Sequence, residues 1–354
     1  MKDRRQIFNK VLAACPDRKA KGGIAAVAAS YSKCFPGMRF VETNSRHGFL
    51  QGQLKLALAM VKLPWLRLNG AKILHVHSAS GKSFIRKTAV MAWARLLGYK
   101  IVFHSHSGLL KGYAEKVGKH KVAKIVGKAN HVVVLSPVWE KYFLTDMNCS
   151  KVSVVNNIVE EPQTPQIPSP DGKVRFLFLG ILVERKGIFD LLEAVKIVAR
   201  RCPDRFSLTV GGGQGEEERF KKLIAGEDLN TYVEYAGWLE GQQKEEALAK
   251  ADVIILPSYA EGTPICILEG FVRHLPAISC AVGGVPDLVE SGINGILTQP
   301  GDINAIAEAM TEYINKPDIR KSHGEAGYRT AQQFLPDSVA DSLERIYTEI
   351  LDKS

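Results

Sequence analysis

Two glutamates, Glu261 and Glu269, mark the segment EGTPICILEG, the most specific pattern in the sequence. They follow the apolar run ADVIILPS, and residues 264–271 have the composition of the opening turns of a helix. A helix N-terminus presents unpaired N–H groups and a positive dipole end, which favour a bound phosphate or carboxylate. We therefore expect one glutamate to meet a sugar and the other a ribose. From the spacing alone, two solvated glutamates beside an ordinary helix start are an equally good interpretation.

A pair of cations, Arg185 and Lys186, lies between the apolar run VRFLFLG and the amphipathic stretch FDLLEAVKIVARR. This pattern predicts a strand ending at Gly180 and a helix after the basic pair. Both cations can donate charge-assisted hydrogen bonds to the oxygens of a diphosphate. The alternative is a solvated basic turn, which is the commoner meaning of such a pair on its own.

Two glycine-rich segments also lie next to predicted strands or helices. LTVGGGQGEEE places four glycines at a strand end, where missing side chains let the backbone approach a ligand. It matches neither GxGxxG nor the P-loop, so a tight turn is the favoured interpretation. Near the N-terminus, KGGIAAVAASY sets Gly22 and Gly23 before a helix of small residues, which makes a phosphate cradle of low specificity.

Four histidines gather in the runs ILHVHS and IVFHSHSG: His75, His77, His104 and His106. A zinc site would use such residues, but we expect no metal because no acidic partner lies nearby in the sequence. Polar contacts to a sugar or its leaving phosphate fit better. Strand histidines are usually structural, so we assign a site role only to His106, the last residue before the chain turns.

The elements that must position these residues are apolar runs alternating with longer helix-like stretches. Such a pattern predicts buried parallel sheets with helical crossovers, that is, α/β doubly wound domains. The proline-rich stretch EEPQTPQIPSPDG, residues 160–172, is typical of a linker between two of them. Ligands bind outside the carboxyl ends of such strands, so we expect the two domains to face one another across a cleft. The predicted boundaries are 1–165 for the first domain and 166–337 for the second, with 338–354 a C-terminal helix.

Charge is divided unevenly along the chain. Residues 1–170 hold 27 Lys+Arg and 8 Asp+Glu, a net of +19, so the remaining 20 basic and 29 acidic residues give −9. This asymmetry indicates that the first half faces an anionic surface, either a membrane or a nucleic acid. The six cysteines show no metal or disulfide spacing, and no signal peptide or spanning segment is evident. We expect a cytosolic protein, peripheral to a membrane.

Two basic segments could form that surface. In residues 50–68, leucines and Trp65 alternate with Lys55, Lys62 and Arg67, and Pro64 should break any helix near its end. In residues 109–129, six lysines decorate an apolar helix. The alternative for both is an amphipathic core helix with solvated lysines.

Taken in order, the motifs resemble the family-four glycosyltransferases of GT-B fold over almost the whole chain: KGGI, HSHSG, GILVERKG, VGGGQGE, YAGWLEGQQ, ADVIILPS, EGTPICILEG and AVGGVPDLVESGINGIL. The resemblance implies that Lys186 binds the donor diphosphate, Glu269 the ribose hydroxyls and Glu261 the transferred sugar. It places His106 near that sugar, and the backbone at Gly22 and Gly23 near the phosphates or the acceptor. One departure stands out. The family usually has an arginine directly after the strand-end glycine, where this chain has Ile181, and Arg185 is the candidate substitute.

The resemblance further implies a retaining, metal-independent hexosyltransferase without a cofactor, which uses a UDP-, GDP- or ADP-sugar as donor. With the basic first half, it favours a lipid-linked saccharide acceptor on the inner face of the cell membrane, in capsule or other surface polysaccharide biosynthesis. A soluble acceptor is the nearest alternative. The rivals in other classes are a nucleotide-sugar-binding protein without catalysis and a nucleic-acid-binding protein. The latter lacks any supporting motif.

Overall fold

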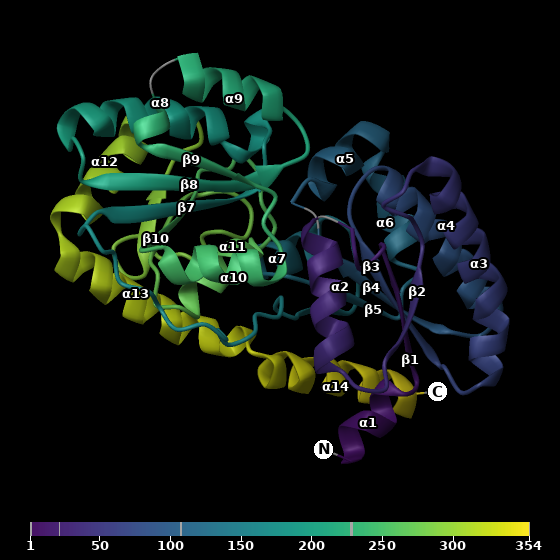
Figure 1. The fold of residues 1–354 in the computed structure, drawn as a ribbon. Helices are drawn as coiled ribbons and strands as arrows, with labels where there is room; N and C mark the ends of the chain where they lie inside the picture. The colour runs from purple at the N-terminus through teal and green to yellow at the C-terminus, as the bar shows by residue number, and fades with distance from the viewer. Residues whose placement is uncertain (1, 21, 107, 227–228, 354) are drawn as a thin grey trace. The chain divides into compact units, whose positions relative to one another are not determined.

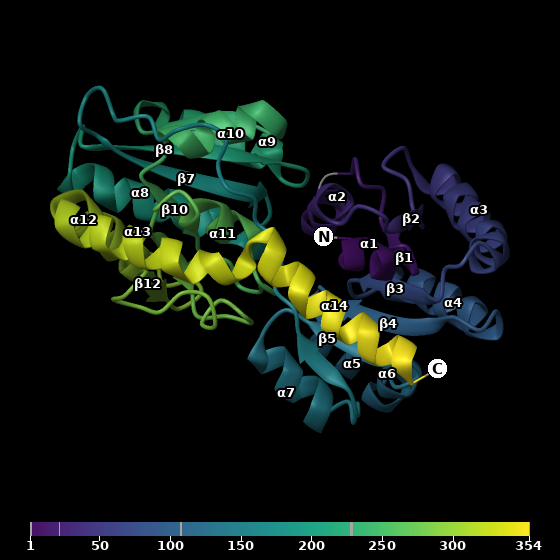
Figure 2. The same cartoon turned by 90° about the horizontal axis from the view of Figure 1, so that it is seen from below.

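The computed structural model describes residues 2–20, 22–106, 108–226 and 229–353 (Figure 1). The chain forms two compact units, one of Met1–Ile158 with Phe334–Ser354 and one of Val159–Gln333. Each unit holds a parallel six-stranded sheet with helices on both faces (Figures 1 and 2). The doubly wound α/β class predicted for both halves is confirmed.

The first unit has the strand order β2-β1-β3-β4-β5-β6. Its strands are β1 (Val11–Cys15), β2 (Arg39–Glu42), β3 (Ile73–Ser78), β4 (Lys100–Ser105), β5 (His131–Val134) and β6 (Val152–Val154). Its helices are α1 (Lys2–Phe8), α2 (Gly23–Cys34), α3 (Phe49–Leu68), α4 (Lys82–Leu96), α5 (Leu110–Val117), α6 (Lys119–Val126), α7 (Pro137–Thr145) and α14 (Pro336–Asp352). Figure 2 shows α14 beside α1, where Arg4 is ion-paired with Asp337 at 2.7 Å.

The second unit has the order β12-β11-β10-β7-β8-β9. Its strands are β7 (Val174–Ile181), β8 (Phe206–Gly213), β9 (Val233–Gly237), β10 (Val253–Leu256), β11 (Ala277–Cys280) and β12 (Gly295–Thr298). Its helices are α8 (Ile188–Arg201), α9 (Glu217–Gly226), α10 (Gly241–Lys250), α11 (Ile265–Phe271), α12 (Ile303–Asn315) and α13 (Pro317–Ala331), with a 3-10 turn at Glu184–Lys186. The buried face of α8 packs on α12 and on the aromatic residues of β7 and β8.

The proline-rich segment is held against the second unit. Ile167 N–H donates to the carbonyl of Ala249 at 2.7 Å, and Arg273 Nη1 donates to the carbonyl of Thr164 at 3.0 Å. These bonds satisfy a backbone that forms no regular element there. They account for the first unit ending at Ile158, ahead of the predicted boundary at 165.

Helix α3 runs through Pro64 to Leu68, so the predicted break is wrong. Proline removes the N–H that would bond the carbonyl four residues back, at Met60. The indole Nε1 of Trp93 on α4 donates to that carbonyl instead, at 3.1 Å. The helix continues because a neighbouring helix supplies the missing donor.

The lysine-rich stretch 109–129 is two helices and not the single helix predicted. Helices α5 and α6 meet at Gly118, whose φ of 104° lies in the region that favours glycine. All six lysines of the stretch are exposed, while Leu110, Ala114, Val122 and Val126 are buried in the core. Both helices are therefore amphipathic, with their charged faces toward solvent.

Substituting Trp93 with Phe should destabilise the first unit by about 1–2 kcal/mol, because the carbonyl of Met60 loses its donor. The double variant Trp93→Phe with Pro64→Ala should regain much of that loss, since alanine at this position restores an N–H four residues after Met60. Urea unfolding of the single and double variants measures the difference. Additive effects in this cycle would show that the indole does not compensate for the proline.

Candidate functional site

The second unit has its topological switch point between β7 and β10, which are hydrogen-bonded neighbours from which the chain continues in opposite directions. Ligands of doubly wound sheets bind at this point, outside the carboxyl ends of the strands. The residues after β7 carry Arg185 and Lys186, and those after β10 carry Glu261. Three of the predicted site residues therefore belong to the two loops at the switch point.

The structure brings Lys186 and Glu261 into contact. Lys186 Nζ donates to Glu261 Oε1 at 2.5 Å, and only 8% of Glu261 is exposed. A charge-assisted hydrogen bond between largely buried partners is stronger than its counterpart at the surface. Without a ligand, the cation predicted to bind a diphosphate is thus occupied by the carboxylate predicted to meet the sugar.

Arg185 supports the same loop. Its Nη1 donates to the carbonyl of Ala260 at 3.0 Å, and its own carbonyl accepts from Tyr259 N–H at 2.9 Å. The guanidinium therefore lies beside the residue that precedes Glu261. Ile181, which stands where an arginine was expected, is the last residue of β7, so Arg185 supplies a cation to this edge from the following 3-10 turn.

Glu269 lies on α11, which begins at Ile265 as the sequence predicts. It accepts from Lys244 Nζ on α10 at 2.5 Å. Burial alone would lower the pKa of Lys244, but the Glu269 charge outweighs it, and the pKa is raised. Lys244 was missed from the sequence because only the fold brings α10 beside α11.

Cys266 lies among these ion pairs, in the first turn of α11. Burial raises the pKa of its thiol to about 12, the Lys186 charge opposes this, and Glu261 and Glu269 add to it. The two glutamates do not contact each other, since each has its own lysine. Both carboxylate charges nonetheless act on this one thiol in the first turn of α11.

Gly211, Gly212 and Gly213 are the last residues of β8, and with Gly215 they form a closely packed strand end and not an open cradle. A Cβ added at Gly212 would lie 2.6 Å from the carbonyl oxygen of Gly180, and one at Gly215 would lie 2.5 Å from that of Leu182. The glycines are needed for close packing between backbones. The tight turn favoured from the sequence is limited to Gln214 and Gly215, because the first three glycines belong to the strand.

The first unit presents Gly22 and Gly23 at its own switch point, between β1 and β3. Gly22 precedes α2 with a φ of 132°, and no side chain caps the helix. A Cβ added at either glycine would meet nothing within 4 Å, so the N-terminus of α2 is open. Lys21 and Ser107, which belong to the motifs KGGI and HSHSG, lie outside the described residues.

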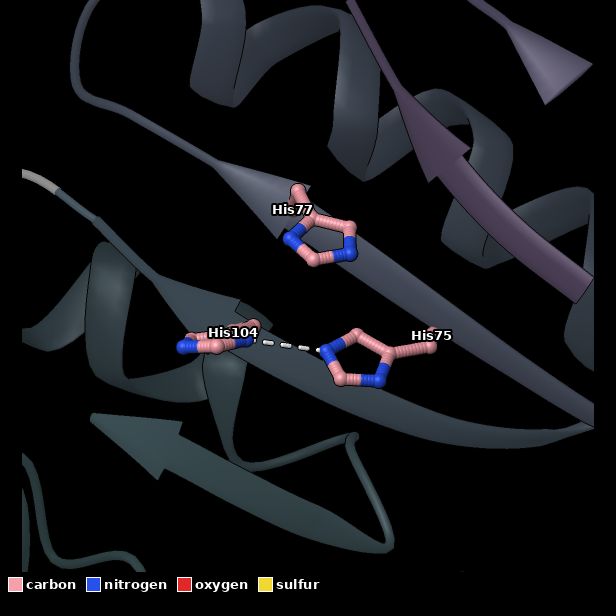
Figure 3. Close-up of side chains that lie close together, drawn as sticks. All are labelled: His75, His77 and His104. Carbon is pink, nitrogen blue, oxygen red and sulfur yellow. Dashed lines mark hydrogen bonds between the residues drawn. The ribbon is translucent and has the colours of Figure 1, made fainter. Parts of the chain in front are cut away.

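His106 directly follows β4, and its backbone N–H donates to the carbonyl of Ser78 at 2.9 Å. Its Nε2 lies 2.9 Å from Nδ1 of His77. His75, His77 and His104 are fully buried beside it, and their potential ligand atoms lie within 4.8 Å of one another (Figure 3). The four histidines that the sequence singled out therefore form one cluster.

Comparison with known proteins finds a family match for the second unit. Residues 159–330 match the family described as glycosyl transferases group 1. The amylovoran biosynthesis glycosyltransferase AmsK of Erwinia amylovora is 26% identical over 64% of this chain and 55% of its own length. An exopolysaccharide phosphotransferase of Streptomyces coelicolor is 29% identical over 46% of this chain and 17% of its own length. The chain thus spans about half, or less, of such curated relatives.

Solved structures share the fold over nearly the whole chain. A sucrose-phosphate synthase of Thermosynechococcus elongatus superposes with a TM-score of 0.81 at 18% identity, covering 97% of this chain and 99% of its own. HepE of Anabaena, solved in complex with UDP, gives 0.74 at 16% identity, covering 96% and 100%. Residues 159–330 are thus similar to the group 1 glycosyl transferases, within a chain that has the two-unit GT-B fold.

Proposed function

We propose that the protein is a glycosyltransferase that moves a hexose from a nucleoside-diphosphate sugar to an acceptor hydroxyl, with retention of anomeric configuration. The observation that carries the proposal is the Lys186–Glu261 ion pair at the switch point of the family-matched unit. HepE binds UDP in the solved complex, and AmsK acts in amylovoran biosynthesis, which makes a UDP-sugar and a polysaccharide acceptor the first choices to test.

The donor diphosphate would replace Glu261 as the partner of Lys186. A diphosphate carries more charge than one carboxylate and can also take hydrogen bonds from Arg185 and from backbone N–H groups in the first turn of α11, which no side chain caps. Glu261, released from its lysine, can then accept from a sugar hydroxyl. Glu269, held by Lys244, can accept from the ribose.

The leaving nucleoside diphosphate is proposed to be stabilised by side chains and backbone N–H groups, without a cofactor or a metal ion. As the sugar–phosphate bond breaks, negative charge grows on the diphosphate, where Lys186 and Arg185 stabilise it in place. His106, with Gly22 and Gly23 of the first unit, is proposed to contact the sugar, the phosphates or the acceptor. Transfer should accordingly persist in EDTA.

Substituting Lys186 with Ala should weaken binding of the nucleoside diphosphate by roughly 1.5–3 kcal/mol, the usual loss for a hydrogen bond to a charged group. Isothermal titration calorimetry measures it. Lys316→Ala is the matched control, because Lys316 pairs with Glu312 at 2.9 Å at the C-terminal end of α12. Unchanged affinity in Lys186→Ala would remove the proposed donor site.

Substituting Glu261 with Gln should lower turnover by about tenfold or more, while nucleoside diphosphate affinity stays equal or rises. The affinity is retained because the uncharged amide no longer competes with the diphosphate for Lys186. Turnover is followed by product NMR, which also reports the anomeric configuration of the transferred sugar. Parallel losses of turnover and of nucleotide affinity would assign Glu261 to the diphosphate site, and an inverted product would refute retention.

The acceptor is proposed to be lipid-linked, because α3 carries an apolar stripe that the protein leaves uncovered. Leu50, Val61 and Leu68 are 82%, 74% and 88% exposed. The stripe consists of Leu50, Leu54, Leu58, Val61, Trp65 and Leu68, all exposed and at helical spacing, while the opposite side of α3 is buried. Contiguous exposed apolar surface of this kind marks an interaction site.

Charge next to the stripe points to an anionic bilayer as its partner. Helix α4 packs on α3, and the ring of Phe84 on α4 lies 5.7 Å from that of Tyr113 on α5, so α3, α4 and α5 are neighbours. The exposed lysines of α5 and α6 therefore share this side of the unit with the stripe. No helix in the described part of the chain has the length and apolar character needed to cross a membrane, so insertion of the stripe would be interfacial. The proposed location is the cytoplasmic face of the cell membrane.

The double variant Leu54→Gln with Trp65→Gln should bind anionic vesicles several-fold more weakly than the wild type, because it removes apolar burial and leaves the lysines in place. Cosedimentation with vesicles of a phosphatidylglycerol and phosphatidylcholine mixture measures it. Ile293→Gln, at an exposed apolar residue of the second unit, is the control. Wild-type sedimentation of the double variant would favour a soluble acceptor.

A binding protein without catalysis is the second candidate, favoured only by Ile181 at the usual arginine position. Such a protein would bind nucleoside diphosphates through Lys186 and yet turn over no donor. The two variants of Lys186 and Glu261 separate it from an enzyme, because only an enzyme has a turnover for Glu261→Gln to lower.

A further inference from the structure

The four histidines of the first unit form a two-by-two array. Along β3 the rings of His75 and His77 stack with centroids 4.5 Å apart, and at the end of β4 the ring of His104 lies 4.0 Å from that of His106 with the two planes tilted by 32°. Across the strands the nitrogens meet edge to edge, His75 Nε2 with His104 Nδ1 at 3.0 Å and His77 Nδ1 with His106 Nε2 at 2.9 Å. Figure 3 shows the first of these contacts. The array is built because β3 and β4 are parallel neighbours with alternate residues on one face.

All four imidazoles are neutral at physiological pH. Burial lowers the pKa of His75 and of His106 to about 3, and lowers those of His77 and His104 well below the usual value. A neutral imidazole has one N–H donor and one acceptor nitrogen. Each edge-to-edge contact is therefore a single hydrogen bond whose direction fixes two tautomers at once.

The arrangement disfavours a metal ion. The rings of His75 and His77 are nearly parallel, with an interplanar angle of 8°. Their in-plane lone pairs therefore lie in separate, nearly parallel planes and do not meet at one point. Lys87, 2% exposed and hydrogen-bonded to Thr43 Oγ1 at 2.6 Å, acts on His77 and His106 as a nearby positive charge. A dication among neutral ligands beside a lysine would also be poorly compensated, since the group of possible ligands among the described residues contains no carboxylate.

The unpaired atom of His77 gives the direction of its hydrogen bond. Nε2 of His77 is buried and has no hydrogen-bond partner among the residues that the structure describes. If His106 donated, His77 would carry its proton on Nε2 as an orphaned buried donor, which is rare in folded proteins. If His77 donates from Nδ1, only a lone pair is left unpaired at Nε2. The second arrangement leaves the smaller penalty.

We propose that His77 is a positioning residue: it donates from Nδ1 to Nε2 of His106 and so holds His106 in the tautomer that carries its proton on Nδ1. His106 Nδ1 makes no hydrogen bond with any described residue, so this N–H is available to an oxygen of the bound sugar or phosphate. The backbone bond from His106 N–H to Ser78 and the adjacent ring of His104, 4.0 Å away, limit the orientation of the donor. The catalytic role of this N–H rests on the proposed function, whereas the tautomer of His106 does not.

The tautomer is measured directly by long-range 1H–15N correlation NMR of the full chain with 15N-labelled histidine, His106 being assigned by loss of its signals in His106→Gln. The expected result is a protonated Nδ1 on His106. Kinetics then compare His77→Leu, which removes the donor, with His77→Asn, whose side-chain N–H lies near the place of Nδ1. The expected result is an about tenfold lower kcat in His77→Leu with little change in donor KM, and substantial recovery in His77→Asn.

His75→Leu is the matched control, since it removes a buried imidazole of the same array that has no hydrogen bond to His106, and the Tm of each variant monitors folding. A proton found on Nε2 of wild-type His106 overturns the proposal whether or not the protein is active. The expected tautomer with unchanged kcat in His77→Leu, or with an equal loss in His75→Leu, overturns the positioning role. Chelation that shifts the signals of His77 and His104 would show a metal site instead. Absence of any transfer would refute the proposed function, and the spectrum would still decide the tautomer.

Discussion

Two glycines, Gly187 and Gly283, allow neighbouring backbone to approach the loop that carries Glu261 closely. Gly187, with a φ of 68°, approaches so closely that an added Cβ would lie 2.0 Å from the carbonyl oxygen of Pro257. Gly283, with a φ of 55°, would place a Cβ 1.9 Å from the carbonyl oxygen of Glu261 itself. Any other residue at either position would push the loop away and add backbone strain. The Lys186–Glu261 contact depends on this close approach, because it sets where the backbone of Glu261 lies.

The two units satisfy buried polar groups in different ways, and the difference suits the chemistry proposed for each. In the second unit largely buried lysines are paired with carboxylates, so an anionic ligand can replace a carboxylate as the partner of a lysine. The first unit buries neutral imidazoles, which need no counter-ion and keep fixed donors and acceptors. Two charged groups of the first unit are exceptions: Asp17 is paired with Lys55 at 2.9 Å, and burial lowers the pKa of Lys87 to about 7, which reduces the cost of its uncompensated charge. At the two proposed sites, ion pairs that a ligand can exchange belong to the second unit, and hydrogen-bonded histidines of fixed direction belong to the first.

Sequence patterns predicted an element correctly where all of its residues share one property, such as apolar side chains along a buried strand. Apolar runs located the central strands, and the motif order indicated the fold, because buried parallel strands must be apolar along their whole length. The patterns failed where one residue is compensated from elsewhere. Pro64 does not end α3, because Trp93 replaces its missing donor. Lys244 could not be linked to Glu269, because their contact depends on how α10 packs against α11. Nor could spacing show that Lys186 and Glu261 would pair.

The basic side chains of the first half are distributed differently on the folded unit than the sequence suggests. Of the three cations interspersed in residues 50–68, Lys55 is turned inward to Asp17 and Glu42, at 2.9 and 2.6 Å. Arg67 lies over the ring of Tyr99 at 5.9 Å. Lys62 stays exposed, so the solvent-facing side of α3 keeps one of its three cations and is more apolar than its sequence suggests, whereas α5 and α6 carry a larger set of exposed lysines. Attraction by charge and insertion by apolar side chains therefore come from different helices of one layer. Such a division permits salt to weaken the approach to a bilayer while leaving the inserted contact largely unchanged.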